Sequence, residues 1–560
     1  MAITHGLRRL RRALWIAAAA AALVLPALAR GAAGAVASPD RYGADAAEEI
    51  LAAGGNAADA AAAVAFALAA TYPDAGNLGG GGFATVYFRG RPYFLDYRER
   101  APAAATANMY LDAKGEVIPD ASTVGVRAAA VPGTVRGLWQ LQRRFGVLPW
   151  RRVLGPAIRY ARDGFVASPR LERECRETAA SLAGRTNFAA YFGAVRTGER
   201  LRQPELAVTL ERIAAEGARG FYAGETARLL VAQMARGGGL VTRADLAAYR
   251  AAWRAPLEAD WAGFRVITAP PPSSGGIGLI ELLKMKAAVA PLFRDVPLNS
   301  PQYVHLLAEI EKRVFADRAE YLGDPDFYAV PVAALTDDAY LAARARELSP
   351  DRPTPTAAVA PGLRDHHSTT HFSVVDRWGN AVSNTFTLND DFGGGVVVEG
   401  AGFLLNNEMD DFSAKPGAPN IFGVVGGEAN AIAPGKRPLS SMTPTILTRD
   451  GRVVRVIGTP GGARFFTSVF QVISDWHDFG MPLAAAVAAT RVHHQLLPPD
   501  TIYEEPYRLL DAATVQALEA RGYRLEDQGW NGDIEAVEVT DRGLVAVPDP
   551  RAIGVGRVLH

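Results

Sequence analysis

Two adjacent threonines, Thr369 and Thr370, stand about two thirds of the way along the chain, where an alternating polar and apolar pattern begins. A threonine hydroxyl becomes a useful nucleophile when a histidine, a metal ion or the residue's own free α-amino group activates it. An α-amino group has a pKa of about 8, so it can act as a base near neutral pH. Thr369 would have this amine only if the bond between Ser368 and Thr369 were cut.

The sequence on either side of Thr369 fits such a cut. Residues 351–367 read DRPTPTAAVAPGLRDHH, a proline-rich and irregular stretch typical of an exposed linker. The segments TTHFSVVD and NAVSNTFTLN then alternate like strands, and RWG between them suits a three-residue hairpin loop with Gly379 in the left-handed conformation. We therefore expect a hairpin that starts at Thr369.

The loop also predicts how the two strands pair. The expected partners are Ser373 with Ser383, His371 with Thr385, and Thr369 with Thr387. Thr370 then falls on the opposite face, together with the apolar residues Phe372, Val374, Val382, Phe386 and Leu388. The hairpin therefore assigns the two neighbouring hydroxyls to different faces.

The N-terminal half contains the elements that would support this hairpin. We expect a first strand at GAVAS (residues 34–38), a helix over 44–53 that ends at Gly54-Gly55, and an alanine-rich buried helix capped by Asn56. Glycines 79–82 lack the Gly-Lys-Ser/Thr ending of a phosphate loop, so close backbone packing is the favoured interpretation. Residues 126–348 are expected to be mostly helical, with strands and turns from Thr369 onward.

Composition and the N-terminus restrict the class of protein. The 560 residues carry 59 Lys and Arg against 59 Asp and Glu, a balance that disfavours a nucleic-acid-binding protein. Residues 1–29 have the basic start, apolar run and small-residue ending of a secretory signal peptide, and the apolar run is short for a membrane anchor. Cleavage after Ala29 is preferred over Ala37. We expect an exported protein, periplasmic or secreted.

Cysteine and histidine usage argues against other chemistries. Cys175 is the single cysteine, so an intramolecular disulfide and a thiolate metal cluster are excluded. The histidines at 366, 367, 371, 493 and 494 lack metal-binding spacing, and no GxSxG nucleophile motif is found, so we interpret them as structural or surface residues. No metal and no cofactor are expected.

Residues 369–393, TTHFSVVDRWGNAVSNTFTLNDDFG, resemble the signature of the γ-glutamyltransferases, also called γ-glutamyl transpeptidases or glutathione hydrolases. Further segments resemble blocks of that family in the same order. They are NLGGGGF (77–83), LDYRERAP (95–102), PPPSSGGIG (270–278), YLGDPDF (321–327), LLNNEMDDFSAKPG (404–417), RPLSSMTPTI (437–446) and GTPGGAR (458–464).

The resemblance implies an N-terminal-nucleophile hydrolase: a mixed α/β (α+β) protein folded as a four-layer αββα sandwich. It also implies a precursor that cuts itself between Ser368 and Thr369. Residues 30–368 would form a large subunit and 369–560 a small one, both within one globule. Glutathione and other γ-glutamyl compounds are the implied donors, with water, amino acids or peptides as acceptors.

The resemblance assigns roles to individual residues. Thr369 would be the nucleophile and Thr387 would orient it, while Gly461 and Gly462 would form the oxyanion hole. The other implied contacts hold the glutamyl zwitterion: Arg98, Ser440 and Ser441 for its α-carboxylate, and Asn389, Glu408 and Asp411 for its α-ammonium. Phe422 stands where several bacterial members carry a lid tyrosine, so its ring keeps the stacking area but lacks the hydroxyl.

Two other interpretations stay open at this point. One is an enzyme with the same fold and nucleophile but another acyl group, such as a cephalosporin acylase or a poly-γ-glutamate-processing enzyme. The other is an uncut binding protein without catalytic activity. Arg98, Asn389, Asp411 and the serine pair disfavour the first, and Thr369, Thr387 and the paired glycines disfavour the second.

Overall fold

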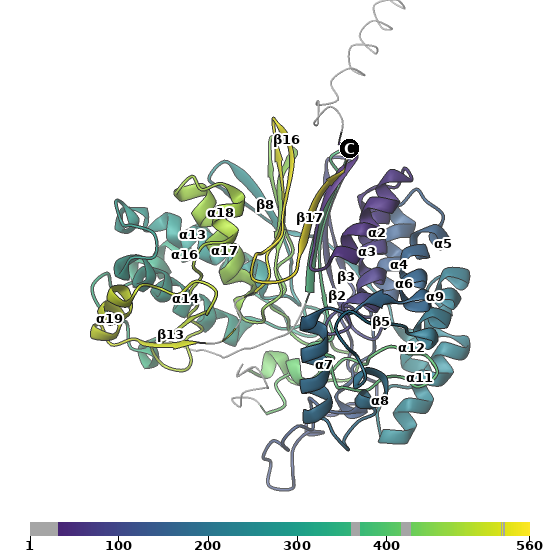
Figure 1. Cartoon of the computed structure of the whole chain (residues 1–560). Helices are drawn as coiled ribbons and strands as arrows, with labels where there is room; N and C mark the ends of the chain where they lie inside the picture. Colours follow the sequence, from purple (N-terminus) through teal and green to yellow (C-terminus); the bar gives the residue numbers. More distant parts are fainter. Residues whose placement is uncertain (1–31, 360–369, 416–426, 528, 530–531, 560) are drawn as a thin grey trace, which may run out of the picture.

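The computed structural model describes residues 32–359, 370–415, 427–527, 529 and 532–559. Two β-sheets lie face to face at the centre, and helices cover the outer face of each, as Figure 1 shows. This is the four-layer αββα sandwich that we expected. Within the ranges given, no helix is both long and apolar enough to cross a membrane.

The first sheet has seven antiparallel strands, in the order β17-β1-β9-β10-β2-β3-β6. β9 and β10 form the predicted hairpin and occupy central positions. The strands are β17 (Val555–Leu559), β1 (Gly34–Ser38), β9 (Thr370–Asp376), β10 (Ala381–Thr387), β2 (Gly81–Phe88), β3 (Arg91–Asp96) and β6 (Ala252–Arg254).

The second sheet has six antiparallel strands, in the order β16-β15-β12-β11-β8-β7. These are β16 (Gly543–Val547), β15 (Glu535–Thr540), β12 (Arg452–Gly458), β11 (Thr445–Arg449), β8 (Phe264–Thr268) and β7 (Leu257–Trp261). Two small pairs lie apart from the sandwich: β13 (Thr501–Glu504) with β14 (Arg524–Asp527), and β4 (Phe165–Val166) with β5 (Arg200–Leu201).

Helices from the N-terminal half cover the first sheet. The outer layers there include α2 (Arg41–Ala52), α3 (Ala57–Thr71), α4 (Thr134–Phe145), α5 (Trp150–Val153), α6 (Gly155–Asp163), α7 (Pro169–Ser181), α8 (Phe188–Phe192), α9 (Pro204–Glu216), α10 (Arg219–Tyr222), α11 (Gly224–Gly237) and α12 (Arg243–Ala248). α3 is buried along its whole length, because small alanine side chains let it lie close to its neighbours. Asn56 caps it through a capping box with Asp59, as its sequence predicts.

A second set of helices covers the other sheet. Its members are α13 (Gly275–Ala288), α14 (Pro301–Tyr321), α15 (Val332–Leu335), α16 (Asp338–Arg346), α17 (Arg464–Asp478), α18 (Leu483–Val487) and α19 (Ala512–Ala520). α14 is buried on nearly every face, which places several charged side chains inside the protein. One of these is Arg318, whose guanidinium bonds the Ser441 hydroxyl.

The central hairpin has the predicted register. Ser373 pairs with Ser383 and His371 with Thr385, and the described ladder ends at Thr370 opposite Phe386. Gly379 has a φ of 77°, the left-handed conformation that the loop requires. The expected pairing of Thr369 with Thr387 falls outside the described residues.

Both faces of this hairpin are buried. Phe372, Val374, Val382 and Phe386 pack in the core beneath the helices of the first sheet. The opposite face meets the second sheet, where Val375 and Ala381 join an apolar cluster and polar side chains are buried beside them. Hydrogen bonds satisfy this polar face: the Ser373 hydroxyl, for instance, donates to the Glu535 carbonyl oxygen at 2.7 Å.

The expectation of a mostly helical segment over 126–348 is incomplete. That segment also contains β7 and β8, which form one edge of the second sheet. β8 pairs with β11, about 180 residues further along the chain. A strand defined by such a distant partner has only a short local signal, so the neighbouring helices dominate the sequence pattern.

Candidate active site

Arg98 lies just beyond the end of β3 and is almost completely buried, with 1% of its surface exposed. Its guanidinium donates to the carbonyl oxygens of Pro438 at 3.4 Å and Leu439 at 3.1 Å. These bonds fix the side chain against the segment that leads to Ser440 and Ser441. The structure thus joins two sequence motifs that are more than 300 residues apart.

Three carboxylates surround the Arg98 guanidinium. Glu408 lies 2.6 Å from Nη1, Glu99 lies 3.6 Å from the same nitrogen, and Asp411 forms a very short ion pair with Nη2. Burial alone would lower the pKa of Arg98, but Glu408, Asp411 and Glu99 together raise it above its ordinary value. Arg98 is therefore a permanent cation in this cluster.

The carboxylates of the cluster outnumber its cation. Burial raises the pKa of Glu99 to about 8 and holds that of Glu408 well above its usual range, although Arg98 opposes both effects. Among the residues described, the side-chain oxygens of Glu99 and Glu408 face mainly the Arg98 guanidinium and the Asp411 carboxyl group. A site with one fixed cation and spare buried acceptors suits a ligand that carries both a carboxylate and an ammonium group.

The turn that holds Glu408 and Asp411 is tied to the rest of the site. These two residues begin and end the short 3-10 helix η4 (Glu408–Asp411). The side chain of Asn430 donates to the Asp411 carbonyl oxygen at 2.7 Å and accepts from the Leu439 backbone nitrogen at 3.0 Å. Asn430, which no sequence motif indicated, thereby links the acidic turn to the segment that Arg98 holds.

Ser440 and Ser441 are buried where the segment after Leu439 passes the start of α13. Ser440 pairs with Ser273 through the backbone, and its hydroxyl oxygen accepts from the Met442 nitrogen at 3.2 Å. The Ser441 hydroxyl oxygen accepts from the Arg318 guanidinium at 2.9 Å. The predicted serine pair thus lies on the same segment that contacts Arg98.

Thr387 is the last residue of β10, and Asn389 lies two residues beyond it. The Thr387 hydroxyl oxygen accepts from the Asn389 backbone nitrogen at 2.8 Å. Asn389 has a φ of 85°, which asparagine tolerates better than most residues, and its amide donates to the Asn407 carbonyl oxygen at 3.1 Å. This bond connects the end of the hairpin with the residue just before Glu408.

The glycine run at 79–82 packs against this same region. A Cβ on Gly80 would lie 1.9 Å from the Thr387 carbonyl oxygen, and one on Gly81 would lie 2.6 Å from the Glu99 carboxylate. Both distances are far too short for a side chain. The glycines are therefore needed for close backbone approach, as expected, and they bring Thr387 and Glu99 close to one strand.

Gly461 and Gly462 lie between β12 and α17. Both have positive φ angles, 134° and 66°. They immediately precede the first turn of a 15-residue helix, where backbone N–H groups and the helix dipole favour negative charge. This position suits the predicted oxyanion hole, because glycine exposes its backbone N–H without a covering side chain.

Histidines near the site have structural roles. His371 is fully buried between the sheets, with its ring nitrogens 2.9 Å from the Thr385 hydroxyl and 3.1 Å from the Ser373 hydroxyl. Burial lowers its pKa to about 3, so it stays neutral at physiological pH. His493 and His494 are buried as well. In the described part of the chain, no group of three or more His, Cys, Asp or Glu side chains is arranged to hold a metal ion.

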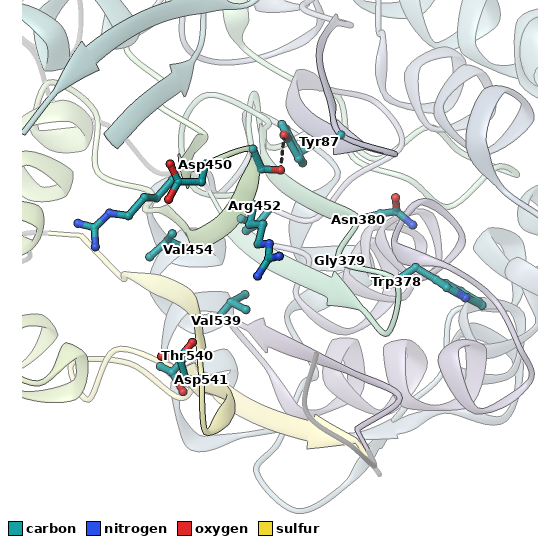
Figure 2. Close-up of a pocket in the computed structure, with 14 residues that line it drawn as sticks. Tyr87, Trp378, Gly379, Asn380, Asp450, Arg452, Val454, Val539, Thr540 and Asp541 are labelled. Carbon is teal, nitrogen blue, oxygen red and sulfur yellow. Dashed lines mark hydrogen bonds between the residues drawn. The ribbon is translucent and has the colours of Figure 1, made fainter. Parts of the chain in front are cut away.

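The cavity in Figure 2 lies at the end of the sandwich away from Arg98 and Thr387. It has a volume of about 710 Å³, and turns between strands line it, including Trp378 and Gly379 of the hairpin loop. The Tyr87 hydroxyl donates to the Gly451 carbonyl oxygen across it at 2.8 Å. β9 runs from Thr370 to this loop, so the cavity lies a full strand away from the predicted nucleophile.

Several predicted positions lie outside the described residues: Ser368, Thr369 and the lid residue Phe422, together with the signal peptide at 1–29. Of the other predictions, Arg98, Glu408 and Asp411 contact one another directly. Thr387, Asn389 and the serine pair connect to them through the backbone. Glu99, Asn430, Ser274 and Arg318 were missed, although Glu99 and Ser274 stand inside the quoted motifs LDYRERAP and PPPSSGGIG.

A four-layer αββα sandwich with this central hairpin is the architecture of the N-terminal-nucleophile hydrolases. A family model described as gamma-glutamyltranspeptidase matches residues 43–559. The chain therefore belongs to the gamma-glutamyltranspeptidase family.

Individual relatives agree with this assignment. A glutathione hydrolase proenzyme of Pseudomonas aeruginosa is 61% identical over 527 residues, which cover 94% of both chains. A cephalosporin acylase of Bacillus halodurans superposes with a TM-score of 0.84 at 29% identity, covering 95% of this chain and 96% of its own. A gamma-glutamyltranspeptidase from Pseudomonas nitroreducens, solved with L-DON, is 57% identical with a TM-score of 0.57; the match covers 58% of this chain and 97% of that one.

Proposed function

We propose that this protein is an exported γ-glutamyltransferase that cuts itself between Ser368 and Thr369 and then uses Thr369 as its nucleophile. In the cut, the Thr369 hydroxyl attacks the Ser368 carbonyl carbon, and the C–N bond between Ser368 and Thr369 breaks, which frees the α-amine. Water then hydrolyses the resulting ester, which leaves a carboxylate on Ser368 and restores the Thr369 hydroxyl. The name glutathione hydrolase proenzyme, given to the 61% identical relative, supports processing of this kind.

The cluster around Arg98 carries the assignment of the substrate. The γ-glutamyl end of glutathione has an α-carboxylate and an α-ammonium on one carbon, so its site needs a cation and an anion side by side. Arg98 provides the cation, and the carboxyl groups of Asp411 and Glu408 lie within ion-pair distance of it as acceptors for the ammonium. An ammonium entering beside the two carboxylates would replace part of their present interaction with Arg98.

The reaction then proceeds by acyl transfer. The Thr369 oxygen attacks the γ-carbonyl carbon while the α-amine takes the hydroxyl proton. The N–H groups of Gly461 and Gly462 stabilise the negative oxygen, and the amine returns the proton to the departing amino group. Water or the amine of an amino acid or peptide then attacks the γ-glutamyl ester, which releases glutamate or a new γ-glutamyl compound and restores Thr369.

An acylase on the same fold is the second candidate, and the solved cephalosporin acylase supports its scaffold. The buried charges favour the first candidate, because an acyl group without an α-amino acid end would leave Arg98 and its carboxylates without a role. We further propose that residues 1–29 direct export and that Phe422 covers the site as an aromatic lid.

The test begins with purified protein on a denaturing gel and N-terminal sequencing of the smaller band. We expect this band to start at Thr369. We also expect the sample to hydrolyse glutathione and to release p-nitroaniline from γ-glutamyl-p-nitroanilide. Thr369→Ala should remain one uncut chain. A wild-type chain that stays whole would refute the catalytic proposal, and a band starting at Thr369 without γ-glutamyl release would favour the acylase.

A further inference from the structure

Arg318 lies near the C-terminal end of α14, and 5% of its surface is exposed. Its Nε donates to the Ser274 hydroxyl oxygen and its Nη2 donates to the Ser441 hydroxyl oxygen, each at 2.9 Å. The Ser274 hydroxyl in turn donates to the Ser440 carbonyl oxygen at 2.8 Å. The Arg318 guanidinium therefore bonds Ser441 directly and Ser440 through Ser274, and these two serines are the predicted contacts of the substrate carboxylate.

The direction of these bonds decides what Ser441 can do. A guanidinium has only donors, so Ser441 must accept the bond from Arg318. The Ser441 proton must then point to an acceptor other than Arg318. The Ser274 hydroxyl oxygen lies 3.3 Å away, a long contact that a substrate carboxylate at normal hydrogen-bond distance would replace. A hydroxyl that accepts from a cation is also a stronger donor, because the two bonds polarise each other. An anionic carboxylate is the acceptor that gains most from such a donor.

The carboxylates around Arg98 explain why a second cation near the substrate carboxylate would strengthen binding. The two terminal nitrogens of Arg98 already face Glu408 and Asp411, with Glu99 close by. A substrate carboxylate that approached Arg98 alone would meet a guanidinium surrounded by carboxylates. A second cation bonded to the same segment would offset that repulsion.

Both arginines bond the segment from Pro438 to Ser441. Arg98 bonds its first two carbonyl oxygens, and Arg318 bonds the hydroxyl of its last residue. We propose that Arg318 is a positioning residue for the substrate: it fixes the Ser441 hydroxyl as a donor and supplies a second positive charge for the α-carboxylate of the γ-glutamyl donor. This inference rests on the proposed function.

The test uses donors that differ in one group. γ-Glutamyl-p-nitroanilide has both the carboxylate and the ammonium, glutaryl-p-nitroanilide keeps only the carboxylate, and 4-aminobutyryl-p-nitroanilide keeps only the ammonium. With Arg318→Lys and Arg318→Gln, kcat/KM should fall by roughly tenfold to a hundredfold for the two carboxylate donors, mainly through KM, as expected for a hydrogen bond to a charged group. It should change less than about twofold for 4-aminobutyryl-p-nitroanilide.

A merely structural role predicts another pattern. If Arg318 only supports the fold, all three donors should lose activity equally, and this result would overturn the proposal. Arg313→Lys is the matched control, because Arg313 is a buried arginine of the same helix whose guanidinium bonds Glu309 and not the serines. It should leave the ratio between the three donors unchanged.

Two further measurements keep the test decisive. If the Arg318 variants fail to fold, Ser274→Ala removes one anchor of the guanidinium and should give a smaller loss with the same preference for carboxylate donors; an equal loss on all donors contradicts the proposal. Arg318→Gln combined with Ser441→Ala should cost little more than either change alone, whereas fully additive losses would contradict the coupling. Failure of the wild type to cleave or turn over any donor would instead refute the proposed function.

Discussion

At the scale of single residues, the site owes its character to an excess of buried carboxylates. Glu99, Glu408 and Asp411 share Arg98, so they cannot all be matched by one charge. Burying several ionised groups is costly unless each has a partner, which makes such a cluster a poor device for stability. In the proposed function its value lies in binding, because the ammonium of the γ-glutamyl donor would supply further positive charge to these carboxylates.

The first prediction concerns Asp411, which forms the very short pair with Arg98. Asp411→Asn keeps the shape but removes a negative charge, so the ammonium of the donor should bind less well. We expect KM for γ-glutamyl-p-nitroanilide to rise by roughly tenfold or more, in line with loss of a hydrogen bond to a charged group. Steady-state kinetics of the processed enzyme measure this.

Asp410→Asn is the control for that change. Asp410 is the neighbouring residue in η4, but its carboxylate accepts from the Ser122 hydroxyl at 2.6 Å instead of facing Arg98. Its KM for the same donor should stay close to that of the wild type. Equal KM values for the two variants would contradict the role given to Asp411.

A second prediction concerns Asp475 in α17, far from Arg98 in sequence and 2% exposed. Burial raises its pKa to about 7, and Lys286 opposes this effect while Asp478 adds to it. The folded protein therefore binds more protons here than the unfolded chain between about pH 4 and pH 7. Stability must fall as pH rises through that window.

Asp475→Asn removes this proton uptake while keeping the side-chain size. From pH 5 to pH 8, the unfolding free energy of the wild type should fall relative to that of the variant by on the order of 2 kcal/mol, since one pKa unit is about 1.4 kcal/mol. Thermal unfolding of both proteins at the two pH values measures this fall. A difference between them that is the same at pH 5 and pH 8 would contradict the raised pKa.

At the scale of elements, local signals and distant contacts were predicted with unequal success. β1, the capped helix α3 and the β9–β10 hairpin follow from short patterns, and the structure contains them with the expected caps and register. β7 and β8 were missed because their sheet partners come from another part of the chain. Likewise, only the family resemblance predicted that Arg98 and Glu408 share one site. No local sequence pattern distinguishes Arg318 from the other buried residues of α14.

Gly80 allows a prediction about how β2 meets the end of β10. In Gly80→Ala, the new Cβ would lie 1.9 Å from the Thr387 carbonyl oxygen, so the two segments must separate. We expect a cost of about 1 to 3 kcal/mol in unfolding free energy, typical of overpacking, and slower appearance of the small subunit. Denaturant unfolding and a time course on denaturing gels measure the two effects.

Gly155→Ala provides the comparison. Gly155 begins α6, and the closest atom to its added Cβ would be a side-chain nitrogen of Arg159 at 3.4 Å, an ordinary contact. Alanine also favours a helix over glycine, so stability should be unchanged or slightly higher. If both alanine variants behaved alike, close packing at Gly80 would not be the reason for its identity.

At the scale of the whole molecule, the proposed cut divides the chain without dividing the fold. In the first sheet, β9 lies between β1 and β10, and the C-terminal strand β17 pairs with β1 near the N-terminus. In the second sheet, β7 and β8 precede the cut, whereas the four strands beyond them follow it. Each sheet therefore contains strands from both proposed subunits.

This interleaving predicts that the two subunits stay together after cleavage. Separating them would break the β1–β9, β2–β10 and β8–β11 ladders and expose unpaired strand edges in both sheets. In size-exclusion chromatography, the processed protein and uncut Thr369→Ala should elute at the same volume, and both bands of the processed form should appear in one peak on a denaturing gel. Denaturant should separate the bands, and neither subunit should regain a cooperative unfolding transition alone, since each would lack strands of both sheets. A small subunit that eluted by itself under native conditions would show that the ladders across the cut do not hold the molecule together.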